Sequence, residues 1–388
     1  MSIRCTYRCS ECGKTYDITP DIMLCPDCSK KQRDKEPLRG ILEVIYRAEA
    51  GIKIEDLMPV EKKYFPHIPV GNTPLWKPKE LGAHANLYLK DDTGNLTGSF
   101  KDRASLLVAA FAKKHGITRI VLASTGNAAS SMAGVAAAAG LKTTIFLPKT
   151  APRAKMIQVL QYGATVISVD GNYDKAFDLS LEYSKKHRFL SRNTAYNPLT
   201  IEGKKTVSAE ICKELKGPPD YVFVPVGDGV ILSGVYKGFR DLLEFGFIKK
   251  IPEIIAVQAE GSAAVYNAFK NGTFSFAPSE TIADSIAVDI PRCGYYALKQ
   301  LKEYHGKTVL VSDEEILLAQ KRLSERSGLF AEPAAAASYA AYVKMKSSLP
   351  ENAEIVLMIT GNGLKDADAA TAKLTFPEKH IKSIGEIS

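Results

Sequence analysis

The apolar positions along the chain form short, dense runs separated by longer stretches of helical character. From about residue 40 onward these runs are rich in Val, Ile and Leu. Nearly continuous apolar runs are typical of strands that are buried on both faces of a parallel sheet. We therefore predict strands at residues 120–123, 143–147, 165–169, 221–226, 253–257, 308–311 and 354–359.

The helical stretches between these runs end at glycines. Residues 128–140, 155–163 and 313–328 each finish on a glycine, which tolerates the left-handed conformation that commonly closes a helix. Alternating strands and helices predict an α/β fold with mostly parallel sheets. Ligands of such sheets bind beyond the carboxyl ends of the strands, so the turns at those ends are the first places to look for chemistry.

The first 40 residues follow neither pattern and contain five of the seven cysteines. Two Cys-x-x-Cys pairs in a chain without an apolar leader predict a structural zinc site in a reducing compartment, in preference to four free thiols. Cys5 is a spare cysteine. We expect a zinc-ribbon-like segment at residues 1–40 and a cytoplasmic protein. The predicted metal ligands are Cys9, Cys12, Cys25 and Cys28.

The charge of the chain changes this picture little. A net charge of +8 is compatible with nucleic-acid binding, but the basic residues are scattered among 43 acidic ones and form no basic tract. A basic balance also suits an enzyme that handles anionic cofactors and substrates. A zinc-ribbon nucleic-acid-binding protein with an inactive enzyme scaffold therefore remains only a remote alternative. We expect no partner membrane, because no apolar run is long enough to span a bilayer.

A lysine lies at the beginning of one predicted helix. Loop and cap residues at 97–99 precede the helical run 104–114, so Lys101 falls in the first turn. The helix dipole disfavours a cation there and favours the neutral amine. A neutral amine can attack a carbonyl carbon. Position alone would favour the alternative, a solvated surface lysine.

The turn at residues 124–127 joins a predicted strand to a helix. The free backbone N–H groups of such a turn bind a carboxylate or a phosphate, and Asn127 can offer its amide to a phenolic oxygen. Ordinary N-capping by Ser124 or Thr125 is the alternative.

Two further strand ends carry turns of the same kind. The glycines of the turn at residues 227–229 let backbone amides approach a phosphate. Asp228 is expected to point its carboxylate away from that phosphate and to cap backbone amides. Thr360 follows another strand, and its hydroxyl could bind a neutral pyridine nitrogen, although a plain turn is the alternative.

Taken together, these segments resemble the threonine synthase branch of the fold-type II pyridoxal-5′-phosphate (PLP) enzymes, the tryptophan synthase beta superfamily. The resemblance runs from about residue 40 to near the end of the chain, and the cysteine-rich segment before it resembles the short ribbon of many threonine synthases. The matching motifs lie at residues 71–75, 97–103, 124–127, 197–206, 224–227, 332–334 and 360–366.

The resemblance implies a role for each of these residues. Lys101 would hold PLP as a Schiff base and move protons, which makes it the catalytic residue. The cofactor would bind to Lys101, Asn127, Gly227, Asp228, Gly229, Val230, Ile231 and Thr360. The substrate would bind to Ser124, Thr125, Gly126, Ala128 and Thr200. The reaction would be that of a lyase of amino-acid metabolism, converting O-phosphohomoserine to threonine and phosphate.

Two substrate positions depart from the family pattern. Ala128 stands where relatives that use O-phosphohomoserine have threonine, and Thr200 stands where they have arginine. Arginine binds a phosphate through two parallel hydrogen bonds, whereas Lys204 or Lys205 could replace it only as point charges. The alternative function is β-elimination or β-replacement, because residues 281–288 resemble the threonine and serine dehydratases. Such an enzyme would be a threonine or serine ammonia-lyase or a synthase that uses O-phosphoserine.

The resemblance also implies a domain organisation. Residues 41–100 and 195–388 would form a large PLP-binding domain, and residues 101–194 a small domain that closes on the substrate. The small-molecule substrate would be an amino acid, and the assembly expected from the family is a homodimer.

Overall fold

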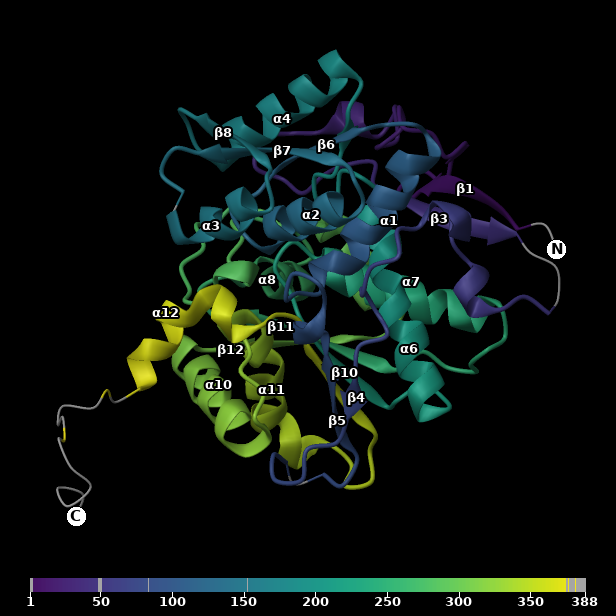
Figure 1. Cartoon of the computed structure of the whole chain (residues 1–388). Helices are drawn as coiled ribbons and strands as arrows, with labels where there is room; N and C mark the ends of the chain where they lie inside the picture. Colours follow the sequence, from purple (N-terminus) through teal and green to yellow (C-terminus); the bar gives the residue numbers. More distant parts are fainter. Residues whose placement is uncertain are drawn as a thin grey trace.

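The computed structural model describes residues 3–47, 51–82, 84–151, 153–374, 376 and 381, and within them the strands form three sheets. A six-stranded and a four-stranded sheet, both flanked by helices, lie one below the other in Figure 1, and a small antiparallel sheet lies to one side. This arrangement confirms the predicted α/β class. No helix among the described residues is long and apolar enough to cross a membrane.

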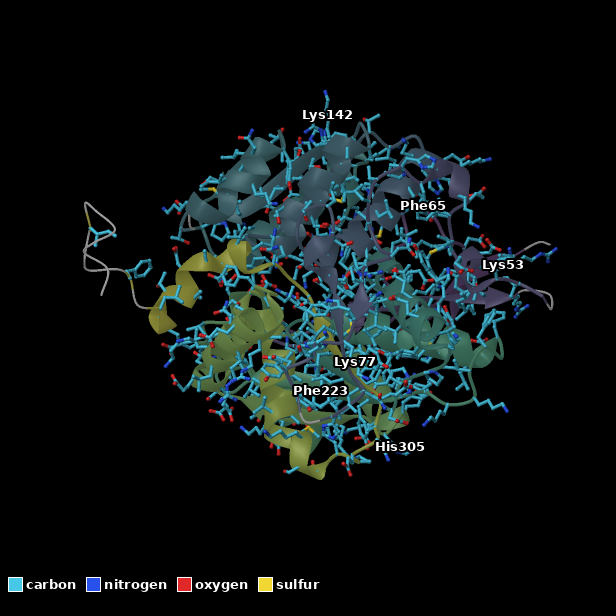
Figure 2. The ribbon with its side chains drawn as sticks, turned by 60° about the horizontal axis from the view of Figure 1, so that its bottom comes forward. Lys53, Phe65, Lys77, Lys142, Phe223 and His305 are labelled. Carbon is cyan, nitrogen blue, oxygen red and sulfur yellow. The ribbon has the colours of Figure 1, made fainter. Side chains whose placement is uncertain are left out.

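The six-stranded sheet is the larger unit. Five of its strands are parallel and the short β4 pairs antiparallel at one edge. Side chains alternate between its two faces, so Phe223 packs toward α10 and α11, whereas Val222 and Val224 pack toward α6 and α7. Figure 2 shows Phe223 within this unit and Lys142 at the far tip of the other. The strand order is β12 (Lys307–Val311), β11 (Glu253–Ala259), β10 (Tyr221–Pro225), β13 (Ile355–Ile359), β5 (Leu87–Asp91) and β4 (Leu75–Trp76).

The helices around this sheet cover both of its faces. They are α5 (Leu199–Glu202), α6 (Thr206–Leu215), α7 (Val230–Glu244), α8 (Ala264–Asn271), α9 (Gly294–Glu303), α10 (Asp313–Ser327), α11 (Pro333–Met345) and the short α12 (Ala367–Ala370). As predicted, Gly328 closes α10 in the left-handed conformation.

The four-stranded sheet is parallel throughout. Its order is β8 (Thr165–Val169), β7 (Lys142–Pro148), β6 (Arg119–Ala123) and β9 (Leu190–Ser191). One face packs on α1 (Lys101–Lys114) and α2 (Asn127–Ala138), with α3 (Arg153–Gln161) beside them, and the other face packs on α4 (Tyr173–His187). All seven predicted strands are confirmed; of the strands in these two sheets, β4, β5 and β9 were not predicted.

The cysteine-rich segment folds as a small antiparallel sheet. Its strands are β1 (Arg4–Cys9), β2 (Thr15–Tyr16) and β3 (Leu42–Arg47), and β1 lies in the middle. β3 follows residue 40 in the sequence, and its side chains reach the larger unit. The Glu43 carboxylate binds Arg240 at 2.8 Å, and the Tyr46 hydroxyl donates to Glu202 at 2.5 Å. The small sheet is therefore joined to the larger unit by buried polar bonds.

Short 3-10 helices occupy several connections. They are η1 (Ser29–Lys31), η2 (Ile54–Asp56), η3 (Lys62–Tyr64), η4 (Asp92–Gly94), η5 (Gly203–Lys205), η6 (Asp284–Ile286), η7 (Lys346–Ser348), η8 (Gly363–Asp366) and η9 (Thr371–Lys373).

Candidate active site

Backbone pairing holds Lys101 at the carboxyl edge of the large sheet. The Phe100 N–H donates to the Thr360 carbonyl at 2.9 Å, and the Asn362 N–H donates to the Gly98 carbonyl at 2.9 Å. The loop before α1 therefore runs beside the segment that follows β13. Gly98 makes this turn possible, because its φ of 80° lies in the left-handed region.

The first turn of α1 is fixed by Asp102. Its carboxylate accepts hydrogen bonds from the Thr97 amide at 2.7 Å and the Thr97 hydroxyl at 2.6 Å. The Lys101 side chain is half-buried, and no described residue forms a hydrogen bond or an ion pair with it. Burial lowers the pKa of the Lys101 amine, Glu332 and Asp228 oppose that shift, and Arg192 adds to it. As predicted, Lys101 begins a helix and the pKa of its amine is lowered, with burial as the main cause.

The turn between β10 and α7 has the close packing expected of a phosphate cradle. A Cβ added at Gly227 would lie 2.9 Å from the Ile286 Cα, and Gly229 has a φ of 81° as the N-cap of α7. The Asp228 carboxylate accepts a hydrogen bond from the Arg292 amide at 3.1 Å, so it caps a backbone amide as predicted. The first N–H groups of α7 therefore stand at this end of the sheet without a capping side chain.

A buried carboxylate lies beside Asn127. The Asn127 side-chain amide donates to the two oxygens of Glu332 at 3.0 and 2.8 Å and to the Ser285 hydroxyl at 3.1 Å. Burial raises the pKa of the Glu332 carboxyl, and the bond from Asn127 opposes this rise. A Cβ on Gly361 would lie 2.3 Å from a Glu332 oxygen, so the glycine after Thr360 makes room for this carboxylate.

The turn from β6 to α2 is not capped by a side chain. Gly126 is the N-cap of α2, and its own N–H donates to the Ser124 hydroxyl at 3.2 Å. The alternative interpretation, capping of the helix by Ser124 or Thr125, is therefore not what the structure has. A Cβ added at Gly126 would meet no atom within 4 Å, because this residue faces open space.

Two adjoining cavities connect these elements. A small one of about 40 Å³ is lined by Lys101, Asn127, Thr194, Thr360 and the turn at residues 227–231. The larger one, of about 490 Å³, is lined by Lys101, Thr194 and residues 123–128 among others. The structure thus brings nearly all the predicted cofactor and substrate residues to one place.

Thr200 is the exception among the predicted residues. Its side chain is fully buried and donates to the Asn197 carbonyl at 2.7 Å, and it lines neither cavity. Glu332, Ser285 and Thr194 also line the site, although no role was predicted for them from the sequence. The sequence did offer a signal for Glu332 and Ser285, because both lie in segments that resemble known families. Nothing in the sequence distinguishes Thr194.

The four predicted metal ligands also come together. The sulfur atoms of Cys9, Cys12, Cys25 and Cys28 all lie within 4.8 Å of one another, and the described part of the chain places no other cysteine in this cluster. The Cys12 and Cys25 sulfurs are 3.7 Å apart. Tetrahedral zinc with sulfur ligands at 2.3 Å requires a sulfur–sulfur separation of about 3.8 Å, so the donor set and its spacing fit zinc.

Comparison with known proteins agrees with this geometry. Residues 68–361 match the family model described as "Pyridoxal-phosphate dependent enzyme". The chain is 36% identical over 394 residues to the threonine synthase of Methanocaldococcus jannaschii, covering 94% of this chain and 93% of that protein. It is 33% identical over 384 residues to the threonine synthase of Methanosarcina acetivorans, covering 92% of each.

Solved structures show the same fold at lower sequence identity. Threonine deaminase isoform 2 from Solanum lycopersicum superposes with a TM-score of 0.66 at 23% identity, over 84% of this chain and 96% of that one. Maize serine racemase superposes with a TM-score of 0.67 at 23% identity, over 76% of this chain and 88% of that one.

Proposed function

This chain belongs to the pyridoxal-phosphate dependent enzyme family and has threonine synthases among its relatives, and from that premise we propose that it converts O-phosphohomoserine to threonine and phosphate. The observation that supports this most directly is the half-buried amine of Lys101, which has no partner among the described residues and lies in a cavity shared with the Gly227 turn and Thr360.

The residues present fit the cofactor. Lys101 would hold its aldehyde carbon, the amides of residues 227–231 its phosphate, Asn127 its 3′-oxygen and Thr360 its pyridine nitrogen. The Thr360 hydroxyl forms no hydrogen bond within the described residues, so it is free for such a bond. When bound, pyridoxal phosphate supplies an electron sink for carbanion chemistry at an amino acid.

The protein's own groups would then position the substrate and move its protons. The N–H groups at residues 124–127, at the start of α2, would bind the substrate carboxylate. Lys101 would take the proton from the α-carbon and return protons further along the side chain, and the lowered pKa of its amine favours the role of a base. The buried wall at Glu332 would limit the access of water to that amine.

Purified holoenzyme incubated with O-phospho-L-homoserine should release threonine and phosphate in equal amounts. Amino-acid analysis and a phosphate assay would measure both products. Phosphate without threonine, or neither product, would contradict the proposal.

A second function is favoured by two positions that depart from the family pattern. Ala128 and Thr200 replace the hydroxyl and the guanidinium that phosphate-using relatives have. In addition, Ser285 lines both cavities within the segment that resembles dehydratases. A β-eliminating enzyme would form 2-oxo acids from serine or threonine, and a synthase would exchange the β-substituent of O-phosphoserine. A screen for 2-oxo acids and for exchanged products separates these reactions from threonine synthesis.

The cysteine cluster would hold one structural zinc ion. Four thiolates leave no open coordination position, so the metal would stabilise the small sheet and take no part in the reaction. Metal analysis of protein purified without added zinc would test this assignment.

The domain organisation and the assembly also remain proposals. The four-stranded unit at residues 101–194 would close over the larger cavity, which is lined by residues 123–128 of this unit and by residues 284–292 of the rest of the chain among others. Small-angle scattering with and without a substrate analogue would test this closure. Light scattering would test for a homodimer, and a gel-shift assay would test the expected absence of nucleic-acid binding.

Replacing Gly227 with alanine should weaken cofactor binding about tenfold or more. The added Cβ would lie 2.9 Å from the Ile286 Cα and would push the turn at residues 227–231 away from residue 286. Such overpacking costs about 1–3 kcal/mol. Gly217→Ala is the matched control, because its Cβ would meet nothing within 4 Å. Titration of apoenzyme with PLP, followed by absorbance, measures both. Equal PLP affinities in the two variants would contradict phosphate binding by the turn at residues 227–231.

The rate of covalent cofactor attachment should level off below pH 10.5. Only the neutral amine reacts, and burial lowers the pKa of Lys101 from that ordinary value. The rate should therefore rise with pH until Lys101 has lost its proton and then stay constant, while free Nα-acetyl-lysine continues to gain reactivity. Stopped-flow absorbance of apoenzyme mixed with PLP between pH 7 and pH 10.5 measures this. A rise that continues to pH 10.5 would contradict the lowered pKa.

A further inference from the structure

An ion pair connects the two sheet units at the rim of the larger cavity. The Arg292 guanidinium binds the Asp174 carboxylate through Nη2 and Oδ1 and lies over the Phe177 ring, 5.0 Å from its centre. Asp174 stands in the first turn of α4, at the top of Figure 1, whereas Arg292 lies two residues before α9 in the larger unit. Both residues line the larger cavity. Since the Asp174 side chain is 59% exposed and that of Arg292 17%, the pair lies where this cavity meets solvent.

Each partner of this pair is held on a rigid base. The Arg292 N–H donates to the Asp228 carboxylate at 3.1 Å, and the Arg292 carbonyl accepts a hydrogen bond from the Leu38 N–H at 3.0 Å. These bonds fix the backbone of Arg292 to the turn that contains Asp228 and to the cysteine-rich segment. On the other side, Phe177 is 5% exposed and packs in the core of the four-stranded sheet, three residues after Asp174. A movement that widens the cavity here therefore breaks the side-chain pair.

Other polar links between the two units are buried. By the proposed domain boundary the chain crosses from one unit to the other at residues 100–101. Arg103 binds Asp92 at 2.8 Å beside this crossing, where a rotation of the units moves atoms least. The bond from Asn127 to Glu332 lies in the small cavity, where the proposed contact of Asn127 with the cofactor would replace it. The pair at the rim is the link that a small molecule meets first on its way from solvent.

The other carboxylates of the larger cavity do not connect the units. Asp228, Asp284 and Asp289 all lie in the larger unit, to which Arg292 also belongs. Asp228 caps the Arg292 amide, and Asp289 accepts hydrogen bonds from the Ser279 amide and hydroxyl at 2.7 Å. Among the described residues that line this cavity, Asp174 is the one carboxylate that the four-stranded unit supplies.

We propose that the Arg292–Asp174 pair is a latch, which holds the four-stranded unit closed over the larger cavity and opens when a small molecule enters or leaves. Arg292 is then a positioning residue that acts through α4. A partly exposed ion pair changes an equilibrium by a factor of about 5 or less, which suits a contact that breaks in every turnover. The latch rests on the proposed closure of this unit and does not depend on which amino acid is the substrate.

A neutral reagent that has to reach the cofactor tests the latch. Phenylhydrazine replaces the Lys101 amine on the aldehyde carbon of PLP and releases that amine, which changes the visible absorbance of the holoenzyme. If opening precedes this reaction, the rate follows the population of the open form. Asp174→Asn and Arg292→Met should each speed the reaction about threefold. The double variant should be no faster than either single variant, because both remove the same pair. Arg292→Lys should react more slowly than Arg292→Met, because an ammonium can still bind Asp174.

The two substitutions change the charge of the cavity in opposite directions. An electrostatic effect on the cofactor would therefore move the two rates apart, whereas loss of the latch raises both. Asp178→Asn makes the same change at an exposed residue further along α4, outside the cavity, and should keep the rate of the unchanged protein. Sodium chloride at about 1 M should bring the rate of the unchanged protein toward that of Asp174→Asn, because salt screens a partly exposed pair. Asp174→Asn alters an exposed side chain, so it tests the latch without disturbing the fold.

Three results would overturn the inference: an unchanged rate in Asp174→Asn, opposite changes in the two single variants, or a double variant accelerated by the product of the single effects, about ninefold. The assay contains no amino-acid substrate. A holoenzyme that forms no threonine but reacts faster in both single variants would therefore support the latch while refuting the proposed reaction.

Discussion

Replacing Lys101 with alanine should reduce turnover by about 10³-fold or more. Among the described residues that line the cavity, Lys101 is the one lysine, and it could both hold the cofactor and move a substrate proton; nearby Lys204 does not line the cavity and donates to the Thr200 carbonyl. General acid–base catalysis alone contributes about 10²–10⁴-fold, and covalent attachment of the cofactor would be lost as well. Steady-state assays with the proposed substrate measure the rate, and borohydride reduction followed by peptide mass analysis locates the attached cofactor.

The design separates chemistry from folding. Lys113→Ala removes an exposed lysine from the same helix and should leave the activity unchanged. Lys101→Ala should still bind the cofactor reversibly through the turn at residues 227–231. It should also keep its melting temperature, because the Lys101 amine has no partner among the described side chains. Borohydride reduction that attaches the cofactor to a residue other than Lys101, or near-normal turnover in Lys101→Ala, would refute the role of Lys101 as the cofactor-binding lysine.

Replacing Cys25 with serine should have the largest effect on stability. Cys25 is fully buried in the four-cysteine cluster, and a zinc ion held by that cluster contributes free energy to folding. The variant should lose the single bound zinc. Its melting temperature should fall by about 10 °C or more, since each kcal/mol of lost stability lowers the melting temperature of a large domain by about 2–4 °C. Inductively coupled plasma mass spectrometry and thermal melting measure the two effects.

Cys5→Ser provides the matched control for this experiment. Cys5 lies on β1 of the same small sheet but outside the cluster, so its replacement should keep both the zinc and the melting temperature. Zinc-free native protein, or a Cys25→Ser variant as stable as Cys5→Ser, would contradict a structural metal site.

The sequence predicted those parts of the molecule that depend on local pattern. Strands such as β10 and β13 are dense apolar runs, and the turns that follow them carry Gly227 and Thr360. Parallel strands place such turns at one edge of the sheet, so the meeting of these two turns could be predicted from the sequence. The strand before the Lys101 loop, β5, was not predicted, and the place of Lys101 beside them followed from the family resemblance.

The remaining parts depend on contacts between distant residues. Glu332 belongs to a matching motif, but its bond to Asn127 follows from the way residues 331–332 pair with residues 361–362. Arg192 is one of many basic residues in the sequence, and only the fold shows that its guanidinium is buried, with Nη1 bound to Thr194 and with Nε and Nη2 unpaired among the described residues. β3 likewise has no signal for joining β1, because that pairing spans more than thirty residues.

The pairing of β5 with β13 has a consequence for the synthesis of the chain. β5 is made early, yet its parallel partner lies at residues 355–359, and the loop before Lys101 binds the carbonyl of Thr360. A nascent chain therefore cannot complete the cofactor pocket until nearly all of it has left the ribosome. Contacts of such long sequence separation form slowly, so cofactor capture should be a late event that reports a finished fold, and a premature stop before residue 355 should yield a product that never binds the cofactor.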